Sequence, residues 1–472
     1  MDKYQCLEII KNMNTIVGVL STSQPVKFGK TKSGKPIYQI KPLKKILPPF
    51  WITYAGKLQG RVIIAFKFRD WNDDSKLPFG EIIDIIGIQN DSILTKTLLQ
   101  HYEIDRKNFK KEIEINPHEN KIIRKDLTHL DIFSIDPIGC IDIDDALSIH
   151  TDNDKTYIGV HIAQPICWLT KDDILERSKK AFSTLYLNDT NNKNLWSDEL
   201  TEKASLLQGQ DKPAYSIIFE ISDSKIISID SFPSLIINKL TTDYDSINYP
   251  NILNVKELTE KITGKEIDSH ELVSFWMVKT NEYIGNNFNN IPYRSQNTNE
   301  TSNISFDSEI KNIFNNFMLE SASYSYDKDF HYSLNISKYT HFTSPIRRII
   351  DTIIHWNITY KDDPISIDLE NINMIDNKTK KFHRHLNLLE SIKNLPDEKE
   401  TSGWIFSIKD NKIMVYFEEI GLTKVKLWDD KFNYLNVGMN NKIKIGEKHT
   451  FTISKKIGFM PNDKLVIKIE NI

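Results

Sequence analysis

Four aspartates crowded into one apolar stretch constrain this chain more than any other feature of its sequence. Residues 134–148 read SIDPIGCIDIDDALS and contain Asp136, Asp142, Asp144 and Asp145. Carboxylates packed beside isoleucines repel one another, so either some of them bind protons or a cation neutralises them. Magnesium binds carboxylate oxygens and keeps room for water and substrate phosphate, which makes it the better interpretation. The stretch is a candidate phosphoryl-transfer centre, with a solvated acidic turn as the alternative.

A second run, YTHFTSPIRRIIDTIIH over residues 339–355, carries two adjacent arginines. Thr-Ser-Pro is typical of a helix start, so the pattern predicts that Ser344 caps a helix and that Pro345 takes its first helical position. Arg347 and Arg348 then fall in the first turn, where their positive charge opposes the helix dipole. Such a placement makes physical sense if an anion such as a phosphate binds there.

Together the two runs resemble the signature of the RNB family, which contains ribonuclease II, ribonuclease R and the catalytic subunit of the eukaryotic exosome. The resemblance rests on aspartate spacings of six, two and one after Ile-Asp-Pro, and on Tyr-x-His-Phe-Thr-Ser-Pro-Ile-Arg-Arg further along the chain. It implies a magnesium-dependent exoribonuclease that degrades single-stranded RNA from the 3′ end to nucleoside 5′-monophosphates. Mn²⁺ would be able to substitute for Mg²⁺.

The resemblance also implies roles for individual residues. Four aspartates would hold the metal, Asp144 among them would be the catalytic carboxylate, and Arg347 would contact the scissile phosphate. Spacing alone does not separate the roles of the aspartates. Tyr186 would stack on the 3′-terminal base, and the tyrosine beside the terminal ribose falls on Thr242 without a gap or on Tyr244 after a two-residue shift. The implied metal ligands are Asp136, Asp142, Asp144 and Asp145, and the implied RNA contacts are Tyr186, Tyr244, Arg294, Arg348 and Glu390.

Several positions depart from the family pattern, among them Ile349 in the second run and Trp356 directly after it, and they leave the function open. Ser274 and Phe275 stand where the family has two helical glutamates, one of which helps to read the ribose, so discrimination between RNA and DNA is in question. Gln164 stands where an aspartate is usual. Two alternatives therefore remain beside the exoribonuclease: a catalytically impaired RNA-binding protein, and an exonuclease with relaxed preference between RNA and DNA.

The order of β-rich and helical stretches predicts an α+β multidomain protein. Residues 1–55 are expected to form a partial, β-rich cold-shock or OB-like unit, and residues 56–125 an OB-like RNA-binding unit with a linker. Residues 126–398 would form the RNB catalytic domain, a mixed sheet with helices. Short alternating strands in residues 403–472 predict a C-terminal OB-like barrel.

Composition bounds the location and the partners of the protein. The chain has three cysteines, no signal-peptide pattern and no apolar run near the roughly 18 residues of a membrane span, so we expect a cytoplasmic protein without a membrane partner. The formal net charge of −3 argues against a general polyanion-binding surface. Any path for single-stranded RNA must then be a local basic surface. The sequence indicates neither a protein partner nor an oligomeric state.

Overall fold

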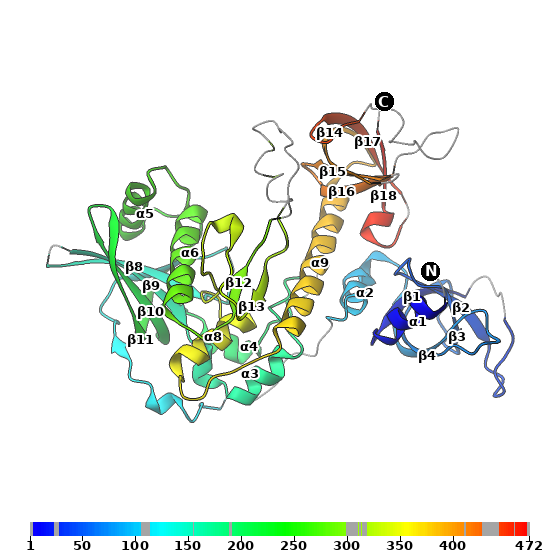
Figure 1. Ribbon diagram of the computed structural model, residues 1–472, viewed down its shortest axis with the longest axis horizontal. Coiled ribbons are helices and arrows are strands. Elements are labelled where there is room, and N and C mark those ends of the chain that lie inside the picture. The colour runs from blue at the N-terminus through cyan, green and yellow to red at the C-terminus, as the bar shows by residue number, and fades with distance from the viewer. Residues whose placement is uncertain are drawn as a thin grey trace.

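The computed structural model describes residues 3–22, 28–104, 114–153, 155–187, 191–298, 310, 313, 319–409, 412–426, 443–456 and 458–469. Figure 1 shows a large central body (residues 114–368), a small barrel at the N-terminal end and a small sheet at the C-terminal end. One long helix, α9 (Leu369–Asn394), runs from the central body to the C-terminal sheet. The predicted α+β multidomain fold is confirmed.

The N-terminal barrel closes five strands around one apolar core. The strands pair in the order β1-β2-β3-β5-β4, and β1 pairs with β4 to close the barrel. The sequence-based boundary at residue 55 is wrong, because it falls between β3 and β4 of this single barrel. Neither half has the partner strands to bury its apolar face alone. The elements are α1 (Lys3–Lys11), β1 (Ile16–Ser21), β2 (Ile37–Pro42), β3 (Phe50–Thr53), β4 (Arg61–Asp70) and β5 (Phe79–Ile88).

The central body is built on a mixed sheet of six strands in the order β10-β9-β8-β7-β11-β6, in which β10 also pairs with β11. The aspartate-rich stretch connects β7 to β8, and β8 forms an antiparallel hairpin with β9. β11 runs parallel to β7. The strands are β6 (Lys125–Asp126), β7 (Ile132–Ile135), β8 (Asp145–Asp152), β9 (Lys155–Ala163), β10 (Asp211–Ser222) and β11 (Lys225–Thr242), with a separate pair β12 (Tyr293–Ser295) and β13 (Ser323–Ser325).

Helices pack against this sheet and complete its core. Trp196, Trp276 and Trp356 are all fully buried in one apolar cluster. Helix α8 is buried on all sides from its first residue to Ile358, and its buried residues include the polar Asp351 and His355. The helices of the body are α3 (Lys171–Ser178), α4 (Asp198–Ala204), α5 (Pro250–Thr263), α6 (Ser269–Asn287) and α8 (Ile349–Thr359).

The C-terminal unit is a five-stranded antiparallel sheet in the order β16-β15-β14-β17-β18, whose outer strands β16 and β18 contact each other. Residues 427–442 of the predicted barrel lie outside the described residues. The strands are β14 (Glu398–Lys409), β15 (Lys412–Phe417), β16 (Gly421–Lys426), β17 (Lys448–Lys455) and β18 (Leu465–Ile469).

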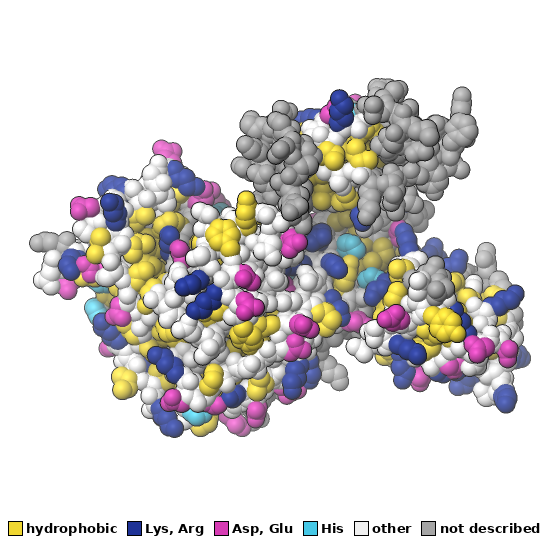
Figure 2. All heavy atoms as spheres, in the orientation of Figure 1, with side chains coloured by type: hydrophobic (Ala, Val, Ile, Leu, Met, Phe, Trp, Pro, Cys, Tyr) yellow, Lys and Arg dark blue, Asp and Glu magenta, His cyan; other side chains and the backbone are white. Residues whose placement is uncertain are grey.

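A second apolar cluster, the junction cluster, joins all three parts around α9 and α2 (Leu94–His101). Lys378 of α9 pairs with Glu103 at 2.8 Å, and Nδ1 of His385 lies 2.9 Å from the hydroxyl of Tyr102. Figure 2 shows basic side chains and histidines gathered in the hollow between the barrel and the central body. The buried residues of the junction cluster are Val17, Ile63, Ala65, Ile86, Leu94, Leu98, Leu99, Ile104, Leu185, Leu187, Phe382, Leu386, Leu389, Phe459 and Met460.

Candidate active site

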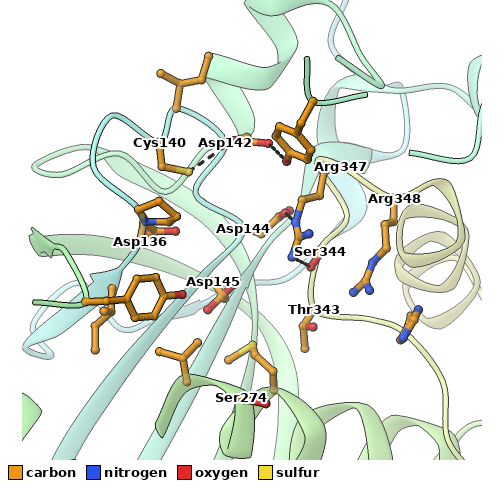
Figure 3. Close-up of a pocket in the computed structure, with 18 of the residues that line it drawn as sticks. Asp136, Cys140, Asp142, Asp144, Asp145, Ser274, Thr343, Ser344, Arg347 and Arg348 are labelled. Atoms are coloured by element: carbon orange, nitrogen blue, oxygen red, sulfur yellow. Dashed lines mark hydrogen bonds and ion pairs between the residues drawn. The ribbon is translucent and has the colours of Figure 1, made fainter. Parts of the chain in front are cut away.

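The two sequence runs meet at one cavity of about 650 Å³ in the central body, here called the acidic cavity (Figure 3). The loop between β7 and β8, together with the first residue of β8, supplies the aspartates, and the turn that leads into α8 supplies the arginines. Helix α6 forms the opposite wall, with Ser274 facing the aspartates across the cavity. Eight residues predicted to form the site line it: Asp136, Asp142, Asp144, Asp145, Tyr186, Tyr244, Arg347 and Arg348.

Asp144 and Arg347 form an ion pair at this cavity. The Asp144 side chain is 3% exposed, and its Oδ1 accepts a hydrogen bond from the backbone N–H of Ile346 at 2.7 Å. Its Oδ2 accepts one from Nε of Arg347 at 3.1 Å. Burial raises the pKa of Asp144 well above its usual value, and these two donors oppose that effect. Because both oxygens accept hydrogen bonds, the contacts are those of an ionised carboxylate.

The turn that carries Arg347 corrects one expectation. The helix begins at Ile349 with Arg348 at its N-cap, whereas the sequence predicted a start at Ser344. Distant partners hold this backbone out of the helix, since Thr184 N–H donates to the Arg347 carbonyl at 2.9 Å and Asp144 binds Ile346 N–H. The guanidinium of Arg347 is therefore aimed at the aspartates and stays 43% exposed to the cavity.

Asp136 and Asp145 supply the unsatisfied negative charge of the site. Burial, followed by repulsion from Asp145, raises the pKa of Asp136 to about 7. Burial also raises the pKa of Asp145 to about 6, against the pull of Arg347. Oδ2 of Asp136 is buried and has no hydrogen-bond partner. An orphaned carboxylate oxygen beside a second carboxylate fits a cation, which would satisfy that oxygen and lower the repulsion.

Asp142 lies on the other side of the aspartate loop and is held by polar contacts. Its Oδ2 accepts a hydrogen bond from the Tyr186 hydroxyl at 2.7 Å, and the thiol of Cys140 lies 3.4 Å from Oδ1. Tyr186 is 41% exposed, so its ring faces the cavity. Burial and the charge of Asp142 both raise the pKa of Tyr186, which keeps the hydroxyl protonated as a donor. Among the described residues, no three His, Cys, Asp or Glu side chains form a preassembled metal cluster.

Of the two residues that the resemblance offers for the ribose side, Tyr244 and not Thr242 lines the acidic cavity. The hydroxyl of Thr242 donates to the Ser246 carbonyl at 2.8 Å. The Tyr244 ring stacks on His270, with ring centroids 3.8 Å apart. Stacking on the end of α6 thus holds the tyrosine at the cavity wall.

Arg348 lines the cavity, but part of its charge is already balanced. Its Nη2 donates to Oδ1 of Asp351 at 2.9 Å, and the same oxygen accepts the backbone N–H of Ser344 at 2.8 Å. Asp351 is fully buried. Arg348 therefore stabilises the turn before α8 as well as contributing positive charge to the cavity.

Two residues implied as RNA contacts lie elsewhere. Arg294 is buried, with its guanidinium 4.5 Å from the Tyr324 ring centroid and 3.7 Å from Oδ2 of Asp376. Packing against these partners places Arg294 outside the acidic cavity, so its contact with RNA stays a prediction. Glu390 is exposed on α9 and does not line the cavity either. A match in sequence position to the family pattern was not sufficient to place the side chain of Arg294 or Glu390 in the cavity.

Ser274 and Phe275, the two residues of α6 that replace family glutamates, point in different directions. Ser274 is exposed and lines the cavity, whereas Phe275 turns to the core and packs edge-on against Trp276. Glu271, at the start of the same helix, closes the capping box of Asp268 and pairs with Lys265. Ser274 alone of these residues faces the cavity.

Gln164 occupies a structural position behind the sheet. It is fully buried, and its Oε1 accepts a hydrogen bond from Nη1 of Arg124 at 2.6 Å. Arg124 also pairs with Glu119 at 2.8 Å. This departure from the family pattern therefore leaves the cavity unchanged.

The sequence reasoning missed several residues of the cavity wall. His341 and Thr343 lie inside the second run, but their residue types gave no separate signal. Nδ1 of His341 lies 2.6 Å from the Tyr324 hydroxyl, and burial holds its pKa well below the usual value. Asn192 lines the cavity from a segment without any motif, and only the structure identifies it.

Comparison with known proteins agrees with this geometry. Residues 124–250 and 293–360 match the family model described as the RNB domain. The chain carries an RNB domain. The resemblance of the two runs to the RNB family is therefore confirmed, and both runs lie within the matched residues.

Curated relatives of this RNB-domain protein are named as ribonucleases or exonucleases. The chain is 25% identical over 335 residues to ribonuclease R of Chlamydia pneumoniae, which covers 53% of this chain and 49% of the relative. It is 29% identical over 196 residues to the human exosome complex exonuclease RRP44, covering 39% of this chain and 20% of that protein. The chain thus spans about half the length of the ribonuclease R relatives that it matches.

Solved structures share the fold of this RNB-domain protein over nearly its whole length. Mycoplasma genitalium RNase R in complex with ribose-methylated single-stranded RNA superposes with a TM-score of 0.75 at 19% identity, covering 96% of this chain and 89% of that chain. Yeast Ssd1, a pseudonuclease, superposes with a TM-score of 0.73 at 14% identity, covering 98% and 83%. At these identities the likeness shows the fold alone.

No described helix has the length and hydropathy required to cross a membrane.

Proposed function

We propose that this RNB-domain protein is a magnesium-dependent exoribonuclease that removes nucleoside 5′-monophosphates from the 3′ end of single-stranded RNA. The observation that carries the proposal is the convergence of Asp136, Asp144, Asp145 and Arg347 on one cavity, with an unsatisfied oxygen on Asp136. The names of the curated relatives support the same activity. Hydrolysis of a phosphodiester needs negative ligands for a cation and a positive group for the phosphate, and both are present.

The donor set suits a hard cation. Asp136 and Asp145 would hold it, because Asp144 and Asp142 already accept hydrogen bonds from Arg347 and Tyr186. A bound Mg²⁺ supplies an activated water and stabilises the leaving 3′ oxygen. Mn²⁺ prefers the same oxygen ligands and should substitute for it.

The chain's own residues would orient the RNA end around that site. Arg347 is anchored at Nε by Asp144 and at Nη2 by the Ser344 hydroxyl, 2.9 Å away. An anchored guanidinium can neutralise charge on the scissile phosphate without a cost for ordering its side chain. The Tyr186 ring would stack on the terminal base, and Tyr244 would lie beside the terminal ribose.

A second candidate function is RNA binding without cleavage. The fold of yeast Ssd1, a pseudonuclease, superposes almost as well as that of RNase R. Against this candidate, an acidic cluster that is half-buried or, at Asp144, fully buried is costly to fold and would have no use in a protein that only binds RNA.

The test is a direct assay on 5′-labelled single-stranded RNA and DNA of equal length, with Mg²⁺ present. We expect a ladder that shortens from the 3′ end of the RNA and releases nucleoside 5′-monophosphates. Binding of RNA without shortening would support the second candidate, and equal degradation of the DNA would show relaxed sugar preference.

Ser274 offers a prediction about that sugar preference. A glutamate at this position would place a carboxylate at the cavity wall, where it can accept a hydrogen bond from a ribose hydroxyl. A hydrogen bond to a charged group contributes ~1.5–3 kcal/mol, so Ser274→Glu should raise the RNA-over-DNA rate ratio by about 10- to 150-fold. The measurement is degradation of a chimeric strand with deoxynucleotides at its 3′ end.

Phe275 provides the matched control on the same helix. Phe275→Glu places its carboxylate toward Trp276 and the core, so it should destabilise the protein without changing the sugar preference. An unchanged ratio in Ser274→Glu would show that this wall does not face the ribose, and Tyr244 would become the first candidate for that contact.

A further inference from the structure

His341 lines the acidic cavity, in the run that also carries Arg347. Its half-buried ring lies between two tyrosines, with its centroid 5.8 Å from that of Tyr324 and 5.7 Å from that of Tyr339. The two ring nitrogens have different surroundings. Nδ1 lies 2.6 Å from the Tyr324 hydroxyl, whereas Nε2 has no hydrogen-bond partner among the described residues and remains accessible. Nε2 is therefore the nitrogen that can bind a molecule in the cavity.

The Tyr324 hydroxyl decides which of these nitrogens carries the proton. Tyr324 is 2% exposed, and Nδ1 of His341 is the one hydrogen-bond partner that its hydroxyl has among the described residues. A buried O–H without an acceptor costs free energy, so the hydroxyl donates and Nδ1 accepts. The neutral imidazole then carries its single proton on Nε2. The cavity wall thus presents an N–H donor at His341.

Tyr324 is itself held in place by neighbours on several sides. It pairs with Arg294 across the β12–β13 ladder, and the Arg294 guanidinium lies 4.5 Å from the centroid of its ring, where a cation is attracted to the aromatic face. The side chain of Asn373 on α9 accepts the N–H of Tyr324 and donates to its carbonyl, both at 2.8 Å. Tyr324 does not line the acidic cavity. Its hydroxyl therefore has a fixed position behind His341.

The charges around His341 favour an anion as its partner. Burial lowers the pKa of His341 well below its usual value, and the positive charges of Arg348 and Arg294 lower it further. The imidazole therefore stays neutral and donates without adding another cation to the wall. Arg348 lines the same cavity. A hydrogen-bond donor in a positive field suits the charged oxygen of a phosphate group.

We propose that Nε2–H of His341 donates to a backbone phosphate of RNA in the acidic cavity, and that Tyr324 is a positioning residue that fixes this tautomer. His341 touches the RNA, whereas Tyr324 acts only through His341. The inference rests on the proposed function, since it assumes that an RNA strand enters the acidic cavity. It adds a neutral phosphate contact beside the charged one of Arg347.

The tautomer can be measured without RNA and without cleavage. Long-range proton–nitrogen NMR spectra of the full chain with isotope-labelled histidine report which ring nitrogen carries the proton, and His341→Phe identifies the signal. We expect the Nε2–H form in the wild type and a loss of that preference in Tyr324→Phe, which removes the hydroxyl and keeps the ring. Tyr293→Phe is the matched control, because its buried side chain on β12 donates to the Phe288 carbonyl at 2.8 Å instead of to His341. An Nδ1–H form in the wild type, or an unchanged tautomer in Tyr324→Phe, would overturn the positioning role.

Binding of single-stranded RNA in an Asp144→Asn background tests the contact itself. His341→Phe keeps a ring and removes the donor, so it should weaken binding by about 10- to 150-fold, the range of one hydrogen bond to a charged group. His341→Gln places an amide nitrogen near the position of Nε2 and should retain most of the binding. Tyr324→Phe should weaken binding by about 2- to 10-fold, because part of the population keeps the proton on Nε2. Tyr293→Phe should leave binding unchanged, and thermal unfolding of each variant reports any general loss of stability.

Modified strands identify the group on the RNA that His341 contacts. A methylphosphonate replaces one charged phosphate oxygen with a methyl group, and a deoxynucleotide removes one ribose hydroxyl. At one linkage near the 3′ end we expect the methylphosphonate to weaken binding when His341 is present and to add nothing to His341→Phe. Deoxynucleotides should add their full effect to that variant.

Methylphosphonate effects that add to His341→Phe at every linkage would contradict the phosphate contact, as would an equal loss of binding in His341→Gln. A deoxynucleotide effect that disappears in His341→Phe would assign the donor to a ribose hydroxyl instead. If the wild-type chain binds RNA but cleaves none, the proposed function fails, while the binding of the modified strands still decides the role of His341.

Discussion

Asp144→Asn should abolish RNA cleavage, with a loss on the order of 10³-fold or more, while RNA binding stays near that of the wild type. The amide keeps the size of the side chain and can still accept the N–H of Ile346. It removes the charge that anchors Nε of Arg347. Loss of one preorganised contact to a reacting group costs about 10²–10³-fold in rate, and here the electrostatics of the metal site change as well. Single-turnover cleavage and filter binding, run side by side, measure the two quantities.

Asp376→Asn is the matched control for this variant. Asp376 is also a buried aspartate paired with an arginine, Arg294, but both lie outside the acidic cavity. It should lower the melting temperature and leave the cleavage rate of the folded protein near wild type. If Asp144→Asn lost binding and cleavage equally, its role would be structural, and the proposed chemistry would have to move to another carboxylate.

The predictions that depended on local patterns were the more successful ones. The spacing of the aspartates from Asp136 to Asp145 and the second run, which contains Arg347, were sufficient to identify residues that line one cavity. The α+β character of the chain was also predicted, because alternating and helical periodicities are local. Each of these features depends on residues that are close in the sequence.

The errors arose where distant residues decide the structure. The helix after Ser344 starts later than its cap signal predicted, because Asp144, some 200 residues earlier, binds the backbone of Ile346. The barrel boundary failed because β3 pairs with β5 in parallel, a contact that no local pattern indicates. Arg294 matched a family strand by position, but Tyr324 and Asp376 determine where its side chain lies.

Removal of divalent cations should stop cleavage as completely as Asp144→Asn does. Asp136 and Asp145 are half-buried carboxylates, and burial followed by repulsion from Asp145 raises the pKa of Asp136 to about 7. Oδ2 of Asp136 has no protein partner. A cation is the group that satisfies that oxygen and relieves the repulsion. EDTA should therefore end the reaction, excess Mg²⁺ or Mn²⁺ should restore it, and much of the RNA binding should survive through the barrels, where no aspartate cluster is involved.

A readout independent of activity strengthens this prediction. A cation that binds only the folded chain raises its stability, by about 2.7 kcal/mol at 100 times the dissociation constant, so Mg²⁺ should raise the melting temperature of RNA-free protein. Asp136→Asn should reduce that gain because it removes a ligand charge, whereas Asp376→Asn should retain it. Cleavage that persists in chelator would contradict the metal mechanism. A melting temperature that rises equally in Asp136→Asn would show that Mg²⁺ binds at some other place on the chain.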